Sequence, residues 1–312
     1  MTATRFVSIF VLLIVLIMPV APVTADALMV PERDALQPAW LLEVPETTGD
    51  VLIADTHSAT MYRFRKTATG LVEVDRRYMS IGQNGAGKKR AWDRKTPLGV
   101  YFITDRLDST KLADQYGVAA FPLDYPNTWD RINGRTGYGI WLHGVDQKNP
   151  QRPPLDTDGC LALPNDELMK LADTLAPLET PVIVTRGMRW SAPQYLSSVR
   201  RELRDAVESW RSSLESGDLL DYLSHYDADF QYRDMEFADW SSWRMAVFER
   251  RPLTSVALGD MMLVADPEEP GLYLSRFTQV LTSAGNSVKT RKRLYWRRDE
   301  AGDWKIVAED SG

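Results

Sequence analysis

The sequence has a single cysteine, Cys160, among its 312 residues. One cysteine excludes an internal disulfide. A free thiol in an oxidising compartment is a liability unless it has a task. The count alone leaves two interpretations equally open, a buried inert thiol or a reactive one.

Long apolar runs are also scarce, because only Phe6 to Met18 forms one. That run is shorter than the roughly 20 residues that a spanning helix needs. It follows Arg5 and precedes Pro19, Pro22 and the small-residue triplet Val23-Thr24-Ala25, which is the pattern of a secretory signal peptide. We expect residues 1–25 to be a cleaved signal peptide rather than an uncleaved anchor, and the protein to be exported to the periplasm or cell envelope.

Positive charge is in deficit, with a formal net charge of −6. Arg5 is the only charged residue of the expected signal peptide, so its removal leaves −7. A net acidic chain lacks the field that nucleic-acid binders use, which argues against nucleic acid as a partner. Histidine is scarce too: His57, His143 and His225 show no metal-ligand spacing, so we expect neither a metal nor a cofactor.

The organisation of the chain changes near residue 46. Residues 26–45 contain Pro31, Pro38 and Pro45 and are expected to form an exposed N-terminal segment. Residues 46–188 contain short runs rich in β-branched and aromatic residues, which predict a mostly β domain. Their order along the chain is Val51–Ala54, Thr60–Phe64, Leu71–Val74, Val100–Ile103, Tyr138–Leu142 and Pro181–Val184.

Residues 189–312 have a different pattern, opening with an expected linker at 189–193. Apolar residues then recur at three- and four-residue steps until Gly217, which predicts one face of an amphipathic helix. Long strand patterns follow from Met261 to Ala308, the last two joined across Asp299 to Gly302 as a hairpin. Helices followed by a curved sheet indicate an α+β cone.

The chemistry is concentrated in Trp141-Leu142-His143-Gly144 and in Asp156 to Leu163 around Cys160. His143 and Cys160 lie 17 positions apart. A thiol attacks a carbonyl as thiolate, and histidine is a suitable base for it. The Gly144 carbonyl is a candidate to orient the other ring nitrogen. Gly159 permits tight backbone geometry, and amides near Gly159 and Cys160 are candidate oxyanion donors.

These residues resemble the L,D-transpeptidase catalytic domain family, often called the YkuD family. That family carries His-Gly, a variable loop, and then Ser/Thr-x-Gly-Cys, which here is His143-Gly144 followed by Thr157-Asp158-Gly159-Cys160. Upstream, Lys95 to Ile103 resembles the family's Thr-Pro-x-Gly-x-Phe strand. The resemblance covers about 140 residues with three elements in the expected order.

The resemblance implies a β-rich fold and a thiolate that attacks the amide between an L-centre and a D-residue in peptidoglycan stem peptides. Cys160 would be the nucleophile, His143 the base and acid, and Gly144 the orienting residue, with Gly159 and Thr157 as support. The acyl group would pass to an amine, giving a 3→3 crosslink or protein attachment. The alternatives are hydrolysis of the same peptides as a carboxypeptidase or endopeptidase, and a non-catalytic envelope protein that binds or regulates.

Two departures from the family pattern bear on this choice. Asp158 stands where many members have His, and Ala162 stands where many have Arg. Both changes concern how a substrate carboxylate or an acceptor is held. We expect Asp158, Arg135 and Tyr138 to contact substrate.

Residues 189–312 resemble the nuclear-transport-factor-2-like (NTF2-like, SnoaL-like) fold. The resemblance rests on Trp210, Gly217-Asp218, Tyr226, Phe230 and Trp304 to Val307. The pairing of domains is similar to that of the cell-shape-determining L,D-carboxypeptidases of helical bacteria. It implies a binding or dimerisation module, so a homodimer or a protein partner is expected at this domain.

Two further segments leave alternatives open. Gly82 to Lys89 nearly matches a phosphate-binding loop, but Lys89 replaces the required Ser or Thr and no helix pattern follows. We expect a loop beside the active cleft whose basic residues meet acidic substrate groups. An insertion with Tyr125, Trp129, Arg131 and Arg135 is either a lid over the cleft or a surface loop with buried anchors.

Overall fold

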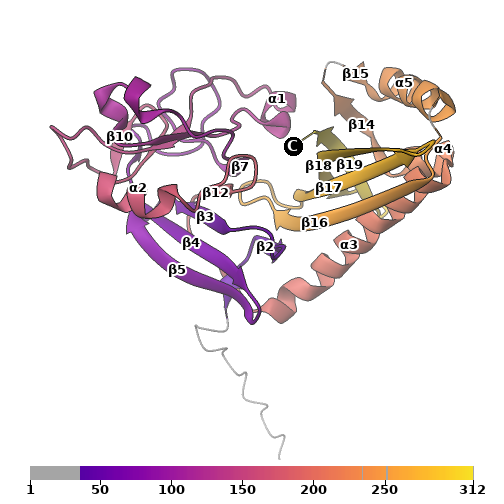
Figure 1. Ribbon diagram of the computed structural model, residues 1–312, viewed down its shortest axis with the longest axis horizontal. Helices are drawn as coiled ribbons and strands as arrows, with labels where there is room; N and C mark the ends of the chain where they lie inside the picture. Colours follow the sequence, from indigo (N-terminus) through magenta and orange to yellow (C-terminus); the bar gives the residue numbers. More distant parts are fainter. Residues whose placement is uncertain (1–35, 234, 251, 312) are drawn as a thin grey trace, which may run out of the picture.

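The computed structural model describes residues 36–233, 235–250 and 252–311. The expected signal peptide lies outside these residues. Within the described part of the chain, no helix combines the length and the apolar character needed to cross a membrane. Two domains lie side by side, with the first in indigo to magenta and the second in orange to yellow (Figure 1).

The first domain is built on a five-stranded mixed sheet of order β5-β4-β3-β12-β7. The central strand β3 (Asp50–Asp55) is buried along its whole length, as its Val-Leu-Ile-Ala run predicts. It pairs in parallel with β12 (Pro181–Thr185), which in turn pairs antiparallel with β7 (Gly99–Phe102). On the other side of β3, β4 (Thr60–Thr67) pairs with it and β5 (Gly70–Tyr78) forms the edge.

Two small sheets lie above this one and carry the His-Gly and Gly-Cys motifs. In the first, β9 (Trp141–His143) lies between β8 (Ala120–Pro122) and β11 (Leu161–Ala162). The second pairs β10 (Leu155–Thr157) with β6 (Ile81–Gly82). The remaining elements are η2 (Ser109–Lys111), η3 (Asp114–Tyr116), α1 (Thr128–Ile132) and α2 (Asn165–Ala172).

The second domain is a seven-stranded sheet of order β15-β14-β19-β18-β17-β16-β2, crossed by α3 (Pro193–Ser216) (Figure 1). The helix begins with Pro193 in its first turn and ends at Gly217, whose φ of 76° suits a left-handed cap. Leu203, Val207 and Trp210 on its apolar face are buried. The other elements are α4 (Leu219–Ser224), β14 (Tyr226–Tyr232), β15 (Met235–Glu236), α5 (Phe237–Arg250), β16 (Ser255–Ala265), β17 (Tyr273–Ser283), β18 (Asn286–Arg298) and β19 (Trp304–Asp310).

The prediction of an exposed segment at 26–45 is wrong for its described part. β2 (Leu41–Glu43) is an edge strand of the second domain's sheet, paired with β16. Trp40, Leu41 and Leu42 are all buried. β1 (Gln37–Pro38) pairs with β13 (Trp190–Ser191), so the expected linker also contains a strand. The prolines marked breaks in the pattern, but the apolar run between them is covered by β16, more than 200 positions away, and by α3.

The two domains share one hydrophobic core. Val100, Phe102 and Ile183 of the first domain pack in the same buried cluster as Met262 and Leu274 of the second. Both faces of the first domain's sheet are therefore covered, one by its own loops and the other by the second domain. This explains why β3 is buried on both sides.

The insertion before the His-Gly motif belongs to this junction. Tyr125 and Trp129 are buried, and Trp129 stacks on Tyr295 with ring centroids 6.4 Å apart. Arg297 lies over the Trp129 ring at 4.7 Å. Of the two alternatives, the structure matches the surface loop with buried anchors, because Trp129 is covered by the second domain and Tyr125 packs in the first domain's own core.

Candidate active site

Adjacent parallel strands bring Cys160 and His143 together. β11 pairs with β9 so that Leu161 faces Leu142 and Ala162 faces His143. Cys160 directly precedes β11 and lies two positions before Ala162, the residue that faces His143. Because alternate residues of a strand point to the same side of a sheet, the side chains of Cys160 and His143 point to the same side. Both side chains line one cavity of about 710 Å³. The segment between the two motifs, which includes β10, returns the chain to the neighbouring strand.

His143 is held in one tautomer by its neighbour. Its Nδ1 lies 2.6 Å from the Gly144 carbonyl oxygen, which can only accept a hydrogen bond, so Nδ1 carries the hydrogen. Nε2 of the neutral ring is then free to take a proton. The Tyr116 ring packs edge-on against the imidazole at 5.1 Å. Burial lowers the pKa of His143 to about 4, opposed by the Gly144 hydrogen bond.

Cys160 contacts the backbone of the facing strand. The Trp141 N–H donates to Cys160 Sγ at 3.4 Å, and the thiol donates to the Gly139 carbonyl at 3.4 Å. Burial raises the pKa of the thiol to about 11. The Trp141 N–H, Arg152 and Lys88 lower it and Asp158 raises it, but burial outweighs them.

These directions specify the resting state of the pair. A thiol with a raised pKa beside an imidazole with a lowered pKa is a neutral pair at pH 7, rather than a thiolate–imidazolium pair. His143 would then act as a general base that removes the thiol proton as Sγ attacks. The neutral state also protects the thiol from indiscriminate reaction, because the thiolate is the reactive form.

Two threonines fix the loop that carries Cys160. Thr157 Oγ1 donates to the Cys160 carbonyl at 2.8 Å and accepts from the Gly159 N–H at 3.1 Å. Thr96, fully buried, donates to the Gly159 carbonyl at 3.0 Å and accepts from the Gly82 N–H at 2.9 Å. The Thr-Pro element and the Thr-x-Gly-Cys element therefore meet through one hydroxyl.

Gly159 is required by conformation rather than as an oxyanion donor. Its φ is 126°, and a Cβ there would lie 2.7 Å from the Lys95 carbonyl oxygen. Its N–H is already bonded to Thr157 Oγ1, so the expectation that this amide serves an oxyanion is not met. The supporting role expected of Thr157 and Gly159 corresponds to this hydrogen-bonded turn.

The near phosphate-loop sequence forms one wall of the cavity, where the sequence analysis expected it. We call residues 84–95 the basic loop; Lys88, Ala91, Trp92 and Arg94 all line the cavity. The loop closes around Asp93, which accepts from the Lys88 ammonium at 2.8 Å and from the Lys89 and Arg90 amides. Burial alone would raise the pKa of Asp93, but these donors lower it to about 2.

The three expected substrate contacts have different outcomes. Asp158 and Tyr138 line the cavity, and both are exposed. Arg135 does not line it, since its guanidinium bonds Asp130 at 3.0 Å and Glu269 at 2.7 Å. The prediction for Arg135 is wrong, because two carboxylates at the domain junction already occupy the side chain.

Several residues of the site were not predicted from the sequence. Tyr116 and Arg152 line the cavity, and Thr96 supports it from below. Tyr116 belongs to η3, a short turn with no motif, so no sequence signal marks it. Thr96 lies within the Thr-Pro element, but the sequence alone does not show that it lies beside Gly82 in the fold. Among the described residues, no group of three or more His, Cys, Asp or Glu could hold a metal ion.

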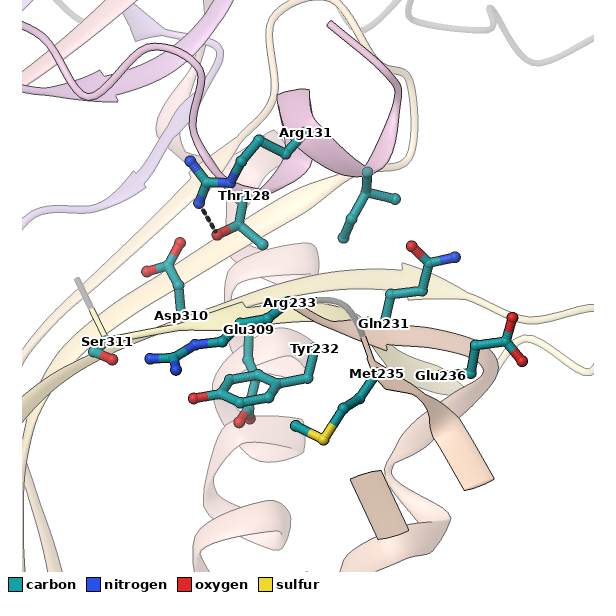
Figure 2. A pocket seen from close by; sticks show the side chains of 11 residues that line it. Thr128, Arg131, Gln231, Tyr232, Arg233, Met235, Glu236, Glu309, Asp310 and Ser311 are labelled. Atoms are coloured by element: carbon teal, nitrogen blue, oxygen red, sulfur yellow. Dashed lines mark hydrogen bonds between the residues drawn. The ribbon is translucent and has the colours of Figure 1, made fainter. Parts of the chain in front are cut away.

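A second cavity lies away from Cys160, where α1 faces β14 and the end of β19. Its volume is about 820 Å³. Thr128 and Arg131 come from the first domain, whereas Gln231, Tyr232, Arg233 and Glu309 come from the second (Figure 2). Arg131 donates to Thr128 Oγ1 at 2.9 Å, so this guanidinium is used within its own helix.

Each of the two domains matches a known family model. Residues 49–184 match the model of the L,D-transpeptidase catalytic domain, and residues 202–310 match that of the Cds6 C-terminal NTF2-like domain. Fold and site thus define a β-rich L,D-transpeptidase catalytic domain followed by an α+β NTF2-like domain. No curated protein matches the chain.

Solved structures share the whole two-domain arrangement. Bdellovibrio bacteriovorus Bd1075 is similar with a TM-score of 0.72 and 27% identity, over 89% of this chain and 98% of that one. The helical cell shape determining protein Pgp2 from Campylobacter jejuni is similar with a TM-score of 0.68 and 23% identity, over 86% and 96%. A point mutant of Pgp2 gives 0.70 and 23%, over 88% and 94%. The similarity to Pgp2 bears on the fold alone.

Proposed function

We propose that this protein is a peptidoglycan L,D-carboxypeptidase of the cell envelope. It would cleave the amide between an L-centre and the terminal D-residue of a stem tetrapeptide through a thioester at Cys160. The observation that carries the thioester step is the shared cavity of Cys160 and His143, with Nδ1 fixed on Gly144 and Nε2 available as base. Export is part of this proposal and rests on the signal-peptide pattern of residues 1–25.

The proposed reaction has two steps. His143 Nε2 takes the thiol proton while Sγ bonds to the amide carbonyl carbon, and the imidazolium then returns the proton to the departing amine of the D-residue. Water next gives a proton to Nε2 and its oxygen bonds to the thioester carbon, releasing the tripeptide. The thiolate recovers the proton from the imidazolium, so no proton is gained or lost overall at the enzyme.

The cations of the cavity suit an anionic peptide. Lys88, Arg94 and Arg152 line it, and a stem tetrapeptide ends in a free carboxylate. Each cation has an acidic neighbour, with Arg152 Nε 3.5 Å from Asp156 and Arg94 Nε 3.5 Å from Asp158. A substrate carboxylate would compete with these long contacts, which supports recognition of the terminal D-residue.

The choice of water over an amine acceptor rests on two residues. Asp158 puts a negative charge at the mouth of the cavity, and Ala162 is buried and supplies no positive charge. Many L,D-transpeptidases have His and Arg at these positions. Transfer to an amine, giving 3→3 crosslinks, is the second candidate, because the thioester is common to both.

Incubation with disaccharide tetrapeptide, followed by chromatography and mass spectrometry, tests the proposal. We expect tripeptide and free D-alanine from the wild type and from His57→Ala, whose histidine is exposed and away from the cavity. Cys160→Ala and His143→Ala should give neither product. New 3→3 dimers would instead establish transfer. Unchanged peptides, together with no carbapenem adduct at Cys160, would establish a non-catalytic protein and overturn the proposal.

A further inference from the structure

One loop of the NTF2-like domain is built to present two adjacent carboxylates. We call residues 266–272, between β16 and β17, the acidic loop. Asp266 Oδ1 accepts from the Glu268 and Glu269 amides, each at 2.9 Å, and the Asp266 N–H donates to the Leu272 carbonyl at 2.9 Å. Pro267 and Pro270 further limit its backbone. The loop lies at the junction of the domains, near β7 and β12 (Figure 1).

Glu269 holds one wall of the Cys160 cavity. Its carboxylate accepts from Arg135 at 2.7 Å, and the same guanidinium donates to Asp130 at 3.0 Å. Arg135 is the first residue of the 135–139 segment, whose Gly137, Tyr138 and Gly139 line the cavity. The Gly139 carbonyl accepts the thiol of Cys160. Only three residues thus separate Arg135, which Glu269 holds, from Gly139, whose carbonyl contacts the nucleophile.

Glu268 reaches a second, adjoining wall through Arg186. The Arg186 guanidinium donates through both Nε and Nη2 to this carboxylate, at 3.0 and 2.7 Å. It also packs against the basic loop, since a Cβ on Gly87 would lie 3.2 Å from Arg186 Nη2. Gly87 precedes Lys88, which lines the cavity.

The two walls are also joined to each other. The Thr136 N–H donates to the Lys89 carbonyl at 3.0 Å, and the Ala91 N–H donates to Thr136 Oγ1 at 3.1 Å. A displacement of either wall would therefore also displace the other. The acidic loop bonds the 135–139 segment directly at Arg135, and it reaches the basic loop through Arg186, which packs against Gly87.

We propose that Glu268 and Glu269 are positioning residues for the Cys160 cavity, so that the NTF2-like domain sets the geometry of the catalytic domain's cleft through the acidic loop. Charge-assisted bonds from one preorganised loop fix both walls, because each carboxylate meets a guanidinium with good geometry. The proposal rests on the proposed function only in taking Cys160 as the reacting group.

Another ion pair across the junction supplies the matched control. Glu179 of the catalytic domain pairs with Arg276 at 2.9 Å and also with Arg291, both of the second domain. None of these three residues lines the cavity or contacts the basic loop or the 135–139 segment in the structure described. Glu179→Gln therefore weakens the junction without touching the walls.

Hydrogen–deuterium exchange with mass spectrometry on the full-length protein tests the positioning directly. In Glu269→Gln we expect amide exchange in residues 135–139 to quicken at least threefold, and in Glu268→Gln the same for residues 84–95. Glu179→Gln should leave both segments unchanged. For tetrapeptide hydrolysis, kcat should fall at least threefold in Glu269→Gln, with KM changing less than twofold and the urea midpoint close to that of Glu179→Gln.

A double-mutant cycle shows whether Glu269 acts through Arg135. If it does, Arg135→Gln and Glu269→Gln together slow the reaction no more than the stronger single change. Unchanged exchange in Glu269→Gln, an equal effect in Glu179→Gln, or additive losses would overturn the proposal. Exchange needs no substrate, so a wild type that fails to hydrolyse tetrapeptide would count against the proposed function while leaving this test decisive.

Discussion

At the scale of single residues, burial favours the neutral forms of Cys160 and His143, and the Gly144 hydrogen bond fixes the His143 tautomer. The Gly144 carbonyl does for His143 what a carboxylate does in a Ser-His-Asp triad, but without adding negative charge. This suits a pair in which the imidazole pKa is lowered and the thiol pKa is raised. The chemistry would start when a substrate carbonyl is in place to accept the sulfur.

The neutral resting state predicts slow alkylation of Cys160. With a thiol pKa of about 11, the thiolate fraction at pH 8 is small, and we expect iodoacetamide to react roughly twentyfold more slowly than with free cysteine. The rate should climb with pH toward 11. Mass spectrometry of the alkylated protein measures it, with urea-unfolded protein as control. A rate that is already at its plateau between pH 6 and 8 would show a thiolate–imidazolium pair instead.

The Thr96 hydroxyl predicts a second residue-scale effect. Thr96→Val removes the bonds to Gly82 and Gly159 and leaves a buried donor and acceptor without partners, which should lower the free energy of unfolding by about 2–4 kcal/mol. Thr96→Ser keeps the hydroxyl and should cost about 1 kcal/mol for one lost methyl. Urea unfolding compares the two. Equal stability of the two variants would contradict the role given to this hydroxyl.

At the scale of elements, sequence reasoning predicted what is local and missed what is distant. The strands around Val51, Val100 and Val182, the helix ended by Gly217 and the Cys–His pair all follow from periodicity, caps and motifs. β2 was missed because its partner β16 lies over 200 residues away. Arg135 was misplaced because Glu269, which occupies it, is 134 residues distant. Long-range partners of this kind leave no local pattern.

The edge strand β2 predicts a large stability effect at its neighbour Trp40. This side chain is 1% exposed within the shared core, so Trp40→Ala should lower the free energy of unfolding by about 3–5 kcal/mol. Trp92 is 85% exposed, and Trp92→Ala should change stability by less than about 0.5 kcal/mol. Denaturant titration of both variants is the check. A loss of stability in Trp40→Ala as small as that in Trp92→Ala would mean that the N-terminal strand is not part of the core.

At the scale of the whole molecule, the catalytic domain is completed by the domain that follows it. The buried cluster shared by β3, β7, β12, β16 and β17 contains residues of both domains. Ion pairs such as Arg135–Glu269 and Arg186–Glu268 join the same surfaces around this apolar centre. An apolar junction of this kind opposes free relative motion of the domains.

The shared core predicts that both domains unfold together. Scanning calorimetry of the protein should show one unfolding transition. The near-ultraviolet circular dichroism signal should be lost over the same temperatures. The physical reason is that unfolding of either domain exposes the apolar surface of the other. Two separated transitions would mean that the junction contributes little to stability.

Hydrolysis of disaccharide tetrapeptide in water enriched in oxygen-18 tests whether water resolves a thioester at Cys160. We expect tripeptide carrying one heavy oxygen in its new carboxylate, free D-alanine without label, and no product from Cys160→Ala. Unlabelled tripeptide joined to a second stem in a 3→3 dimer, or tetrapeptide left intact, would contradict it.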